Sequence, residues 1–215
     1  MSKLRCHISI SLDGFAAGPN QSQENPLGEG GMQLHDWVIR LAAWREPHGY
    51  EGGEVNESTR IVEESRENVG AGVMGRNMFG PPGGGPWGDE QWTGWRGDNP
   101  PFHYPVFVLT HHPRQPLDME GGTTFHFVTD GIERALEQAR EAAGGKDVLL
   151  SGGAEVVNEY LAAGLLDELE LSVAPVLLGD GARLFDDLGD AKVQLEQVRV
   201  VEAPGVAHLT YRVVT

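Results

Sequence analysis

The sequence contains a single cysteine, Cys6, among its 215 residues. An intrachain disulfide and a metal site built from several cysteines are therefore excluded. Such sparse cysteine usage is typical of a reducing compartment, and we expect the protein to be cytoplasmic. Cys6 lies within an alternation of apolar and polar residues, where it is most simply a small core residue.

Basic residues are also scarce. The chain has 16 lysines and arginines against 32 aspartates and glutamates, a formal net charge of -16. This charge repels phosphate backbones and anionic lipids, so we expect neither a nucleic acid nor a membrane as a partner. Long apolar runs are lacking too, and the apolar run near the N-terminus ends at Asp13, unlike a signal peptide. An anionic ligand would need basic residues gathered at its site.

The chain shows no shift in composition, linker, repeat or low-complexity tract, so residues 1–215 are interpreted as one domain. Hydrophobic residues make up 40% of the sequence, which is ordinary for a globular protein with a sizeable core. The 30 glycines and 13 prolines indicate long loops between its elements.

The most informative stretch is residues 147–161, with the sequence DVLLSGGAEVVNEYL. A short apolar run, two glycines and an amphipathic segment predict a buried strand, a tight turn and a helix. Gly152 and Gly153 let the backbone approach a ligand closely, and the amides that open the helix attract anions. The turn therefore suits a phosphate, although such turns also serve only to pack a helix on a sheet.

Apolar periodicity predicts the other elements. Strands are expected at residues 4–12, 71–74, 106–109, 123–128, 168–173, 193–201 and 207–214. Helices are expected over residues 34–44, from an Asn56 cap to about residue 70, and from a capping box of Asp130 and Glu133 to about residue 143. Residues 168–173 alternate like a half-exposed strand, and Pro204-Gly205 suits the turn of a C-terminal antiparallel hairpin. Helices between strands predict an α/β fold with a mixed, mainly parallel sheet and helices on both faces.

Three predicted strands end in turns that suit phosphates, namely Gly75-Arg76-Asn77, Thr110-His111-His112 and Ser151-Gly152-Gly153. Ligands of open α/β sheets bind where strand ends and helix starts converge, so a dinucleotide would fit there. Neither the GxGxxG fingerprint nor a P-loop is present. The adjacent histidines point to opposite sides of the chain and lack a suitably spaced third ligand, so we expect no metal.

Two long loops complete the chain. Residues 18–31 are rich in Gly, Asn, Gln and Pro and are interpreted as a lid over an active site. Residues 78–102 carry Trp87, Trp92 and Trp95 among many glycines and prolines. These rings need a surface to cover, which is either the domain itself, a second subunit or a substrate.

Five segments of the chain are distinctive in combination: ISISLDGF (residues 8–15), VMGR (73–76), VFVLT (106–110), SGG (151–153) and LDELELSVAPVLLG (166–179). Together they resemble the dihydrofolate-reductase-like superfamily, and within it the branch that contains the reductase domain of bacterial riboflavin biosynthesis. They cover nearly the whole chain in the right order. The resemblance implies a sheet of about eight strands, a homodimer, and hydride transfer from NADPH to a C=N or C=O group of a small heterocyclic substrate.

The resemblance also implies roles for particular residues. Ile8, Ser9, Ala16 and Ala17 would border the nicotinamide, and Arg76 would meet the adenosine 2'-phosphate, with Arg114 adding to it. The remaining cofactor contacts implied are Gly75, Asn77, Met78, Thr110, His111, Ser151, Gly152, Gly153, Ala154 and Glu155. A cis peptide is implied between Gly152 and Gly153.

The proton donor for such a reduction is not evident. Folate reductases carry an essential carboxylate on the helix before the Gly-Arg turn, and Glu57 is the candidate catalytic residue at that place. The sequence therefore predicts an NADPH-dependent reductase of a pterin, folate or aminopyrimidine-like compound. Two alternatives stay open, which are a true dihydrofolate reductase and a non-catalytic ligand-binding module with the same fold.

Overall fold

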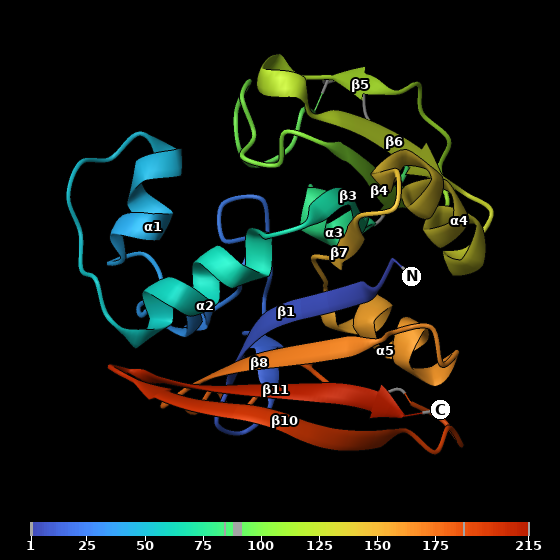
Figure 1. Cartoon of the computed structure of the whole chain (residues 1–215). Helices are drawn as coiled ribbons and strands as arrows, with labels where there is room; N and C mark the ends of the chain where they lie inside the picture. Colours follow the sequence, from blue (N-terminus) through green and yellow to red (C-terminus); the bar gives the residue numbers. More distant parts are fainter. Residues whose placement is uncertain (1, 84, 88–91, 187, 215) are drawn as a thin grey trace.

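A nine-stranded sheet forms the centre of the computed structural model, which describes residues 2–83, 85–87, 92–186 and 188–214 (Figure 1). Its strand order is β10-β11-β8-β1-β7-β3-β4-β6-β5, and β2 and β9 form a separate small sheet. The strands are β1 (Leu4–Ser11), β2 (Phe15–Ala17), β3 (Val69–Gly75), β4 (Pro105–Leu109), β5 (Leu117–Asp118), β6 (Thr124–Val128), β7 (Asp147–Leu150), β8 (Glu168–Ala174), β9 (Ala182–Arg183), β10 (Gln194–Ala203) and β11 (Val206–Val214).

The six strands from β8 to β6 in this order are parallel, whereas β5, β10 and β11 run antiparallel to their neighbours. The mixed, mainly parallel sheet is therefore confirmed. The C-terminal hairpin is confirmed as well, and Gly205 has the positive φ of 75° that its turn requires.

Helices lie on both sides of the sheet, with α4 and α5 on one side and α1 and α2 on the other (Figure 1). The α-helices are α1 (Ala42–Arg45), α2 (Glu57–Arg66), α3 (Arg76–Phe79), α4 (Ile132–Ala143) and α5 (Ala154–Ala162). Three short 3-10 helices are η1 (Gly31–His35), η2 (Glu46–His48) and η3 (Glu120–Gly122). No helix in the described ranges is both long and apolar enough to span a bilayer.

The central strand β1 divides its side chains between two environments. Leu4 and Cys6 are buried in the cluster beneath α4 and α5, which confirms Cys6 as a core residue. Arg5, His7 and Ser9 alternate with them and therefore face the other side of the sheet. This second face is covered in two places, by a cluster around Trp37 that includes residues of α2 and by the aromatic side chains of residues 78–102.

Two predicted elements differ from the structure. Strand β8 is not half-exposed, because it lies inside the sheet between β1 and β11, and even Glu170 is only 9% exposed. Residues 34–44 form no continuous helix, because Leu41 is extended, with a ψ of 138°, and forms a bridge with Glu54. Leu34, Trp37 and Leu41 are nevertheless buried, so their spacing reports burial rather than helical hydrogen bonding.

Helix caps were predicted with mixed success. Asn56 caps α2 through its side chain, as expected, but α2 ends at Arg66 rather than near residue 70. Asp130 does not cap α4, because the N-cap is Gly131 and makes no side-chain hydrogen bond to the helix. The predicted capping box is displaced by one residue from the true start of the helix.

The tryptophan-rich loop packs on its own domain where it is described. Trp87 lies edge-on to Phe79 and Phe127, and its Nε1 donates to the carbonyl of His112 at 2.8 Å. Trp92 Nε1 donates to the carbonyl of Phe79 at 2.9 Å. Of residues 78–102, residues 84 and 88–91 lie outside the described ranges.

Candidate functional site

Two of the predicted phosphate-binding turns are joined by their main chains. The Gly75 amide, at the end of β3, donates to the Gly152 carbonyl at 2.8 Å, and the Ser151 amide donates to the Val73 carbonyl at 2.9 Å. A Cβ atom on Gly75 would lie 2.8 Å from Val156 of α5, so a side chain there would push the helix away. Thr110 follows β4, which pairs with β3 and brings the third turn alongside. The structure therefore gathers all three turns at one end of the parallel strands.

The glycine turn leads directly into α5. Gly153 is the N-cap of that helix and makes no side-chain hydrogen bond to it, so the first amides have no side-chain acceptor. The peptide bond between Gly152 and Gly153 is cis. Free amides at a helix start attract anions. Burial, and then the charge of Glu155, raise the pKa of Glu159 on α5, whereas the charge of His111 lowers it. His111 therefore lies near this helix.

Arg76 and Arg114 lie together over one tryptophan. Their guanidinium carbons are 3.7 Å and 4.9 Å from the centre of the Trp87 ring. Burial lowers the pKa of Arg76, and the neighbouring Arg114 cation lowers it further. Within the described residues neither arginine forms an ion pair with a carboxylate. Two neighbouring guanidinium groups that pair with no described carboxylate, in a chain of net charge -16, form a local positive site that attracts an anion.

The hydrogen bonds of Arg76 leave part of its guanidinium without a partner. Nη1 donates to the carbonyls of Gly80 and Pro81, the latter at 3.1 Å, and so holds the side chain in position. Nε is buried and has no hydrogen-bond partner in the described structure. Arg114 is held similarly, because its Nη1 donates to the Trp92 carbonyl at 2.7 Å. The arginines are positioned by main-chain carbonyls, and the orphaned Nε of Arg76 fits a phosphate of a dinucleotide.

The residues expected to border a nicotinamide come from β1 and β2. Ile8 lies beside the glycine turn, since its Cδ1 is 3.6 Å from the point where a Cβ atom on Gly152 would lie. Ser9 is buried and its Oγ accepts a hydrogen bond from Trp37 Nε1 at 3.3 Å. Ala17 is buried, and Ala16 packs against the core cluster beneath α4 and α5.

The other expected cofactor residues occupy the same turns. Asn77 is exposed on α3, and Met78 packs against the aromatic cluster that includes Phe79. Thr110 Oγ1 accepts from the His112 amide at 3.1 Å, which shapes its turn. Ala154 is buried at the start of α5, whereas Glu155 is exposed.

Glu57 is the first residue of α2 and is exposed. It makes no hydrogen bond to another described side chain or backbone group beyond those of its helix. The adjacent Ser58 is buried instead and donates to or accepts from the His208 ring at 2.8 Å. The helix start therefore directs Ser58, rather than Glu57, into the protein.

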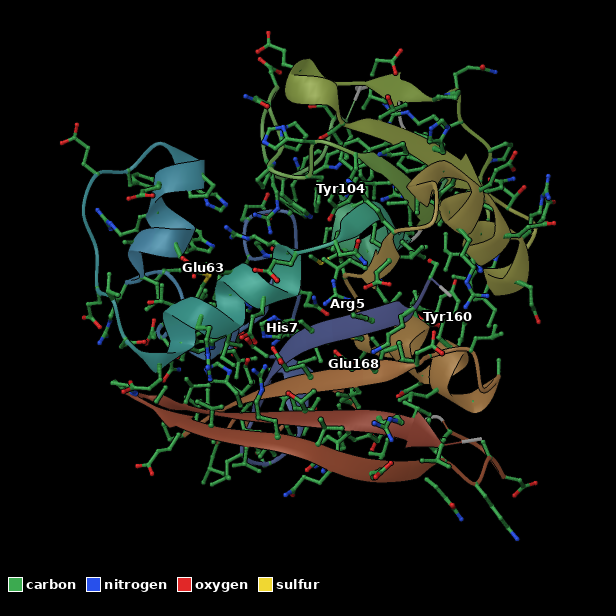
Figure 2. All side chains as sticks on the ribbon, viewed as in Figure 1. Arg5, His7, Glu63, Tyr104, Tyr160 and Glu168 are labelled. Atoms are coloured by element: carbon green, nitrogen blue, oxygen red, sulfur yellow. The ribbon has the colours of Figure 1, made fainter. Side chains whose placement is uncertain are left out.

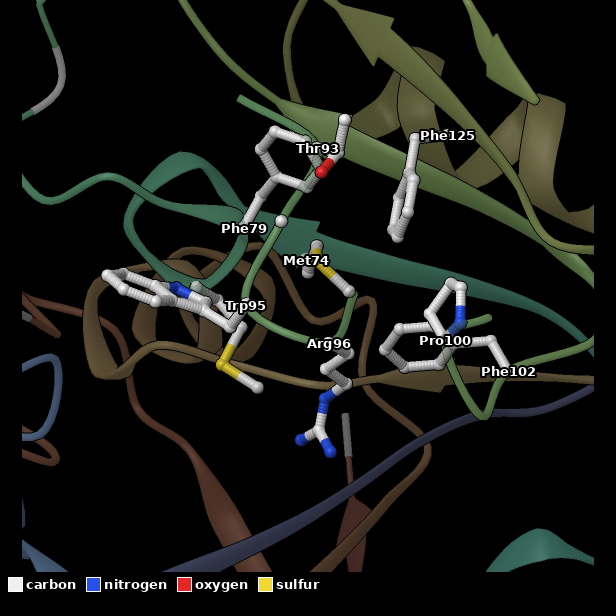
Figure 3. Close-up of a pocket in the computed structure, with 10 residues that line it drawn as sticks. Met74, Phe79, Thr93, Trp95, Arg96, Pro100, Phe102 and Phe125 are labelled. Carbon is white, nitrogen blue, oxygen red and sulfur yellow. The ribbon is translucent and has the colours of Figure 1, made fainter. Parts of the chain in front are cut away.

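A second group of cations lies on the sheet face beside α2, and sequence reasoning did not find it. Burial lowers the pKa of His48, and the charges of Arg96 and Arg66 lower it further. Burial also lowers the pKa of Arg96, and the charge of Arg66 adds to that effect. Arg96 borders a small pocket of about 20 Å3 that is also lined by Met74, Trp95 and Phe102 (Figure 3). Its guanidinium carbon lies 5.9 Å from the centre of the Phe102 ring. In the described structure neither arginine pairs with a carboxylate.

Comparison with known proteins decides the family. Residues 2–209 match the model of the RibD C-terminal domain. The chain belongs to the RibD C-terminal domain family. Protein YyaP of Bacillus subtilis (strain 168), described as uncharacterized, is 34% identical over 86 residues. That alignment covers 40% of this chain and 45% of YyaP, so it spans less than half of the curated relative.

Solved structures share the fold of this RibD C-terminal domain. A Shewanella sp. PV-4 protein assigned to riboflavin biosynthesis has a TM-score of 0.62 at 21% identity, with both chains fully covered. The dihydrofolate reductase of Enterococcus faecalis, solved with NADP(H), has a TM-score of 0.51 at 15% identity, covering 98% of this chain and 96% of that one. The dihydrofolate-reductase-like fold expected from the sequence is thereby confirmed.

This RibD C-terminal domain also contains a buried chain of polar side chains that the sequence analysis missed. His7, Ser172, His208 and Ser58 are linked from β1 through β8 and β11 to α2. Figure 2 shows His7 and Arg5 on β1 beside α2. The signal was present in the sequence, because the polar side chains at positions 5, 7, 9 and 11 mark one whole face of a strand expected in a sheet.

Proposed function

We propose that the protein is an NADPH-dependent reductase that transfers hydride to a C=N or C=O group of a small heterocyclic, pyrimidine-like substrate. The observation that carries the proposal is the Arg76–Arg114 pair beside the glycine turn and the start of α5. Family membership and the NADP(H) complex of the Enterococcus faecalis enzyme support it.

Each part of the site has a role in this proposal. Arg76 and Arg114 would hold the 2'-phosphate, because a guanidinium can give a phosphate two parallel hydrogen bonds. Gly152, Gly153 and the first amides of α5 would hold the pyrophosphate. Ile8, Ser9, Ala16 and Ala17 would border the nicotinamide, which supplies the hydride when the cofactor is bound.

The substrate would lie on the face of the sheet that carries His7 and the Arg66–Arg96 cations. Cations without carboxylate partners favour a polar or negatively charged compound there. Trp95 and Phe102 lie beside Arg96, and their aromatic rings suit contact with a flat heterocycle.

The test is NADPH oxidation by the purified protein with aminopyrimidines, pterins and folates in parallel. We expect turnover of an aminopyrimidine and a preference for NADPH over NADH. Turnover of dihydrofolate alone would indicate a folate reductase. Tight NADPH binding without turnover of any compound would indicate a ligand-binding module, and failure to bind NADPH would overturn the proposal.

A further inference from the structure

One short segment holds both cations of the group beside α2. Arg66, the last residue of α2, donates from Nη1 to the Ala43 carbonyl at 2.8 Å. Arg96 Nη1 lies 3.2 Å from Nε2 of His48, in the same segment. Residues 42–48, which form α1 and η2, therefore hold together two arginines that come from distant parts of the chain.

The ring of His48 has fixed hydrogen-bonding roles. Its Nδ1 lies 2.6 Å from the Trp44 carbonyl oxygen, which can only accept, so Nδ1 carries the hydrogen. A guanidinium can only donate, so the lone pair of Nε2 accepts from Arg96. Only the neutral ring with its hydrogen on Nδ1 satisfies both contacts.

The surroundings of His48 keep its ring neutral and in place. Burial lowers the pKa of His48, the hydrogen bond to the Trp44 carbonyl raises it, and the charges of Arg96 and Arg66 lower it again. The ring also stacks on Trp44, with ring centres 4.0 Å apart and planes 14° from parallel. His48 is therefore a rigid acceptor for Arg96 at neutral pH.

Each of the two arginines is held by one nitrogen and keeps other donors free. Within the described residues, Arg66 and Arg96 make no further side-chain hydrogen bond and no ion pair. Both residues are exposed to solvent, although enough protein surrounds Arg96 for burial to lower its pKa. The planar fork of a guanidinium matches the two oxygens of a carboxylate, so the free donors suit such a group.

The direction of these donors matters as much as their charge, because two parallel hydrogen bonds to a carboxylate form only in a narrow geometry. We propose that His48 is a specificity-determining positioning residue, whose neutral ring orients Arg96 so that Arg66 and Arg96 select a substrate bearing a carboxylate over the matching neutral compound. The inference rests on the proposed reductase function and deepens it, since it names the class of substrate and the residue that sets the preference.

A purely structural role of His48 makes different predictions. The stack on Trp44 contributes to packing, and its loss would lower stability and affect every substrate alike. A positioning role acts through Arg96, so it changes the binding of a charged substrate and leaves a neutral one unaffected. The two roles are therefore separated by comparing a carboxylic acid with its amide.

The first test uses the full-length protein and needs no substrate. Side-chain nitrogen NMR reports which ring nitrogen of each histidine carries the hydrogen. We expect His48 to carry it on Nδ1 at neutral pH, and its Nε2 resonance to shift in Arg96→Leu but not in the control Arg134→Leu on α4. A hydrogen on Nε2 in the wild type, or an unshifted resonance in Arg96→Leu, would overturn the contact that the proposal needs.

The second test is steady-state NADPH oxidation with an aminopyrimidine carboxylic acid and with its neutral amide. His48→Leu should raise KM for the acid roughly two- to tenfold, the range for loss of one hydrogen bond. KM for the amide and both kcat values should stay near those of the wild type, because the contact is the same in the ground and transition states. His48→Gln should restore the low KM, because the side-chain oxygen of glutamine accepts from Arg96 as Nε2 does. Equal changes for the acid and the amide would overturn the proposal.

A double variant shows whether His48 acts through Arg96. Arg96→Leu should raise KM for the acid at least as much as His48→Leu does, and the double variant should raise it no further than Arg96→Leu alone. Losses that add independently would overturn a role through Arg96. If His48→Leu does not fold, Arg96→Leu still decides, because an unchanged KM for the acid would overturn the proposal.

The outcomes separate this inference from the reductase proposal. Turnover of both compounds with the same acid-to-amide ratio of KM in the wild type and His48→Leu removes the role of His48 and leaves the reductase function intact. Absence of turnover in the wild type removes the reductase function and with it the selection of a substrate, while the NMR measurement still decides whether His48 holds Arg96.

Discussion

Replacing Arg76 by Gln should convert a preference for NADPH into near indifference between NADPH and NADH. Nη1 is occupied by the Gly80 and Pro81 carbonyls and Nε is buried without a partner, so a 2'-phosphate would contact the Nη2 side of the guanidinium. A charge-assisted hydrogen bond contributes roughly 1.5 to 3 kcal/mol. Its loss weakens NADPH binding by about tenfold to a hundredfold.

Dissociation constants for both cofactors, measured by calorimetry in the wild type and Arg76→Gln, isolate the phosphate contact. Loss of the stack on Trp87 affects NADPH and NADH alike, so the ratio of the two constants reports the 2'-phosphate alone. Arg45→Gln is the matched control, because Arg45 also lies over an aromatic ring, 5.5 Å from the centre of Tyr50. An unchanged ratio in Arg76→Gln would refute the assignment.

Three further outcomes are expected. Burial lowers the folded-state pKa of His208 to about 4, so the unfolded chain binds a proton first and the wild type should lose stability as pH falls from about 6.5 to about 4. Urea unfolding should show a smaller loss of stability over this pH range in His208→Gln. Competition titration should show that Arg96→Gln weakens binding of a carboxylate-bearing heterocycle several-fold but leaves binding of its neutral amide unchanged. An equal loss of affinity for the acid and the amide would contradict a role of the Arg66–Arg96 cations in binding an anion. Light scattering at micromolar concentration should give a dimer, and Val200→Lys on the open edge strand β10, where Val200 is 54% exposed, should give a monomer; a monomeric wild type would contradict this.

Strand β8 cannot form the interface of the expected dimer. Residues 166–179 are strongly apolar, but their strand β8 is enclosed between β1 and β11. The exposed large apolar side chains of the C-terminal hairpin are instead Leu195, Val198 and Val200 on β10, together with Val214 at the end of β11. Apolarity in the sequence indicated burial here, and only the strand order distinguishes burial within a sheet from burial at an interface.

Most of the sheet could be predicted, because its strands are short apolar runs bounded by glycine, proline or aspartate. The glycine turn at residues 152–153 was predictable for the same reason, since its residue types leave few alternatives. Helix boundaries were less predictable. The extended Leu41 depends on its bridge to Glu54, a contact outside the local pattern.

The cofactor side of the site followed from motifs, whereas the substrate side did not. Arg76 directly follows β3, and Arg114 lies in the connection just beyond the turn that follows β4, where position alone suggests a role. Ser58, Ser172 and His208 are unremarkable in sequence, and they become a line only because β8 and β11 lie side by side under α2. Glu57 was chosen by its place at a helix start, one residue away from the side chain that points inward.

The position of β1 in the strand order constrains how the chain folds. Leu4 pairs with Val148 and Ser11 pairs with Ala174, so the first strand finds both neighbours only in the last third of the sequence. Such distant pairing raises the entropic cost of closing the sheet and slows folding. During synthesis β1 stays unpaired until β7 has left the ribosome, and its second neighbour β8 follows later still. The polar residues at positions 5, 7, 9 and 11 keep the unpaired strand from presenting two apolar faces to other chains.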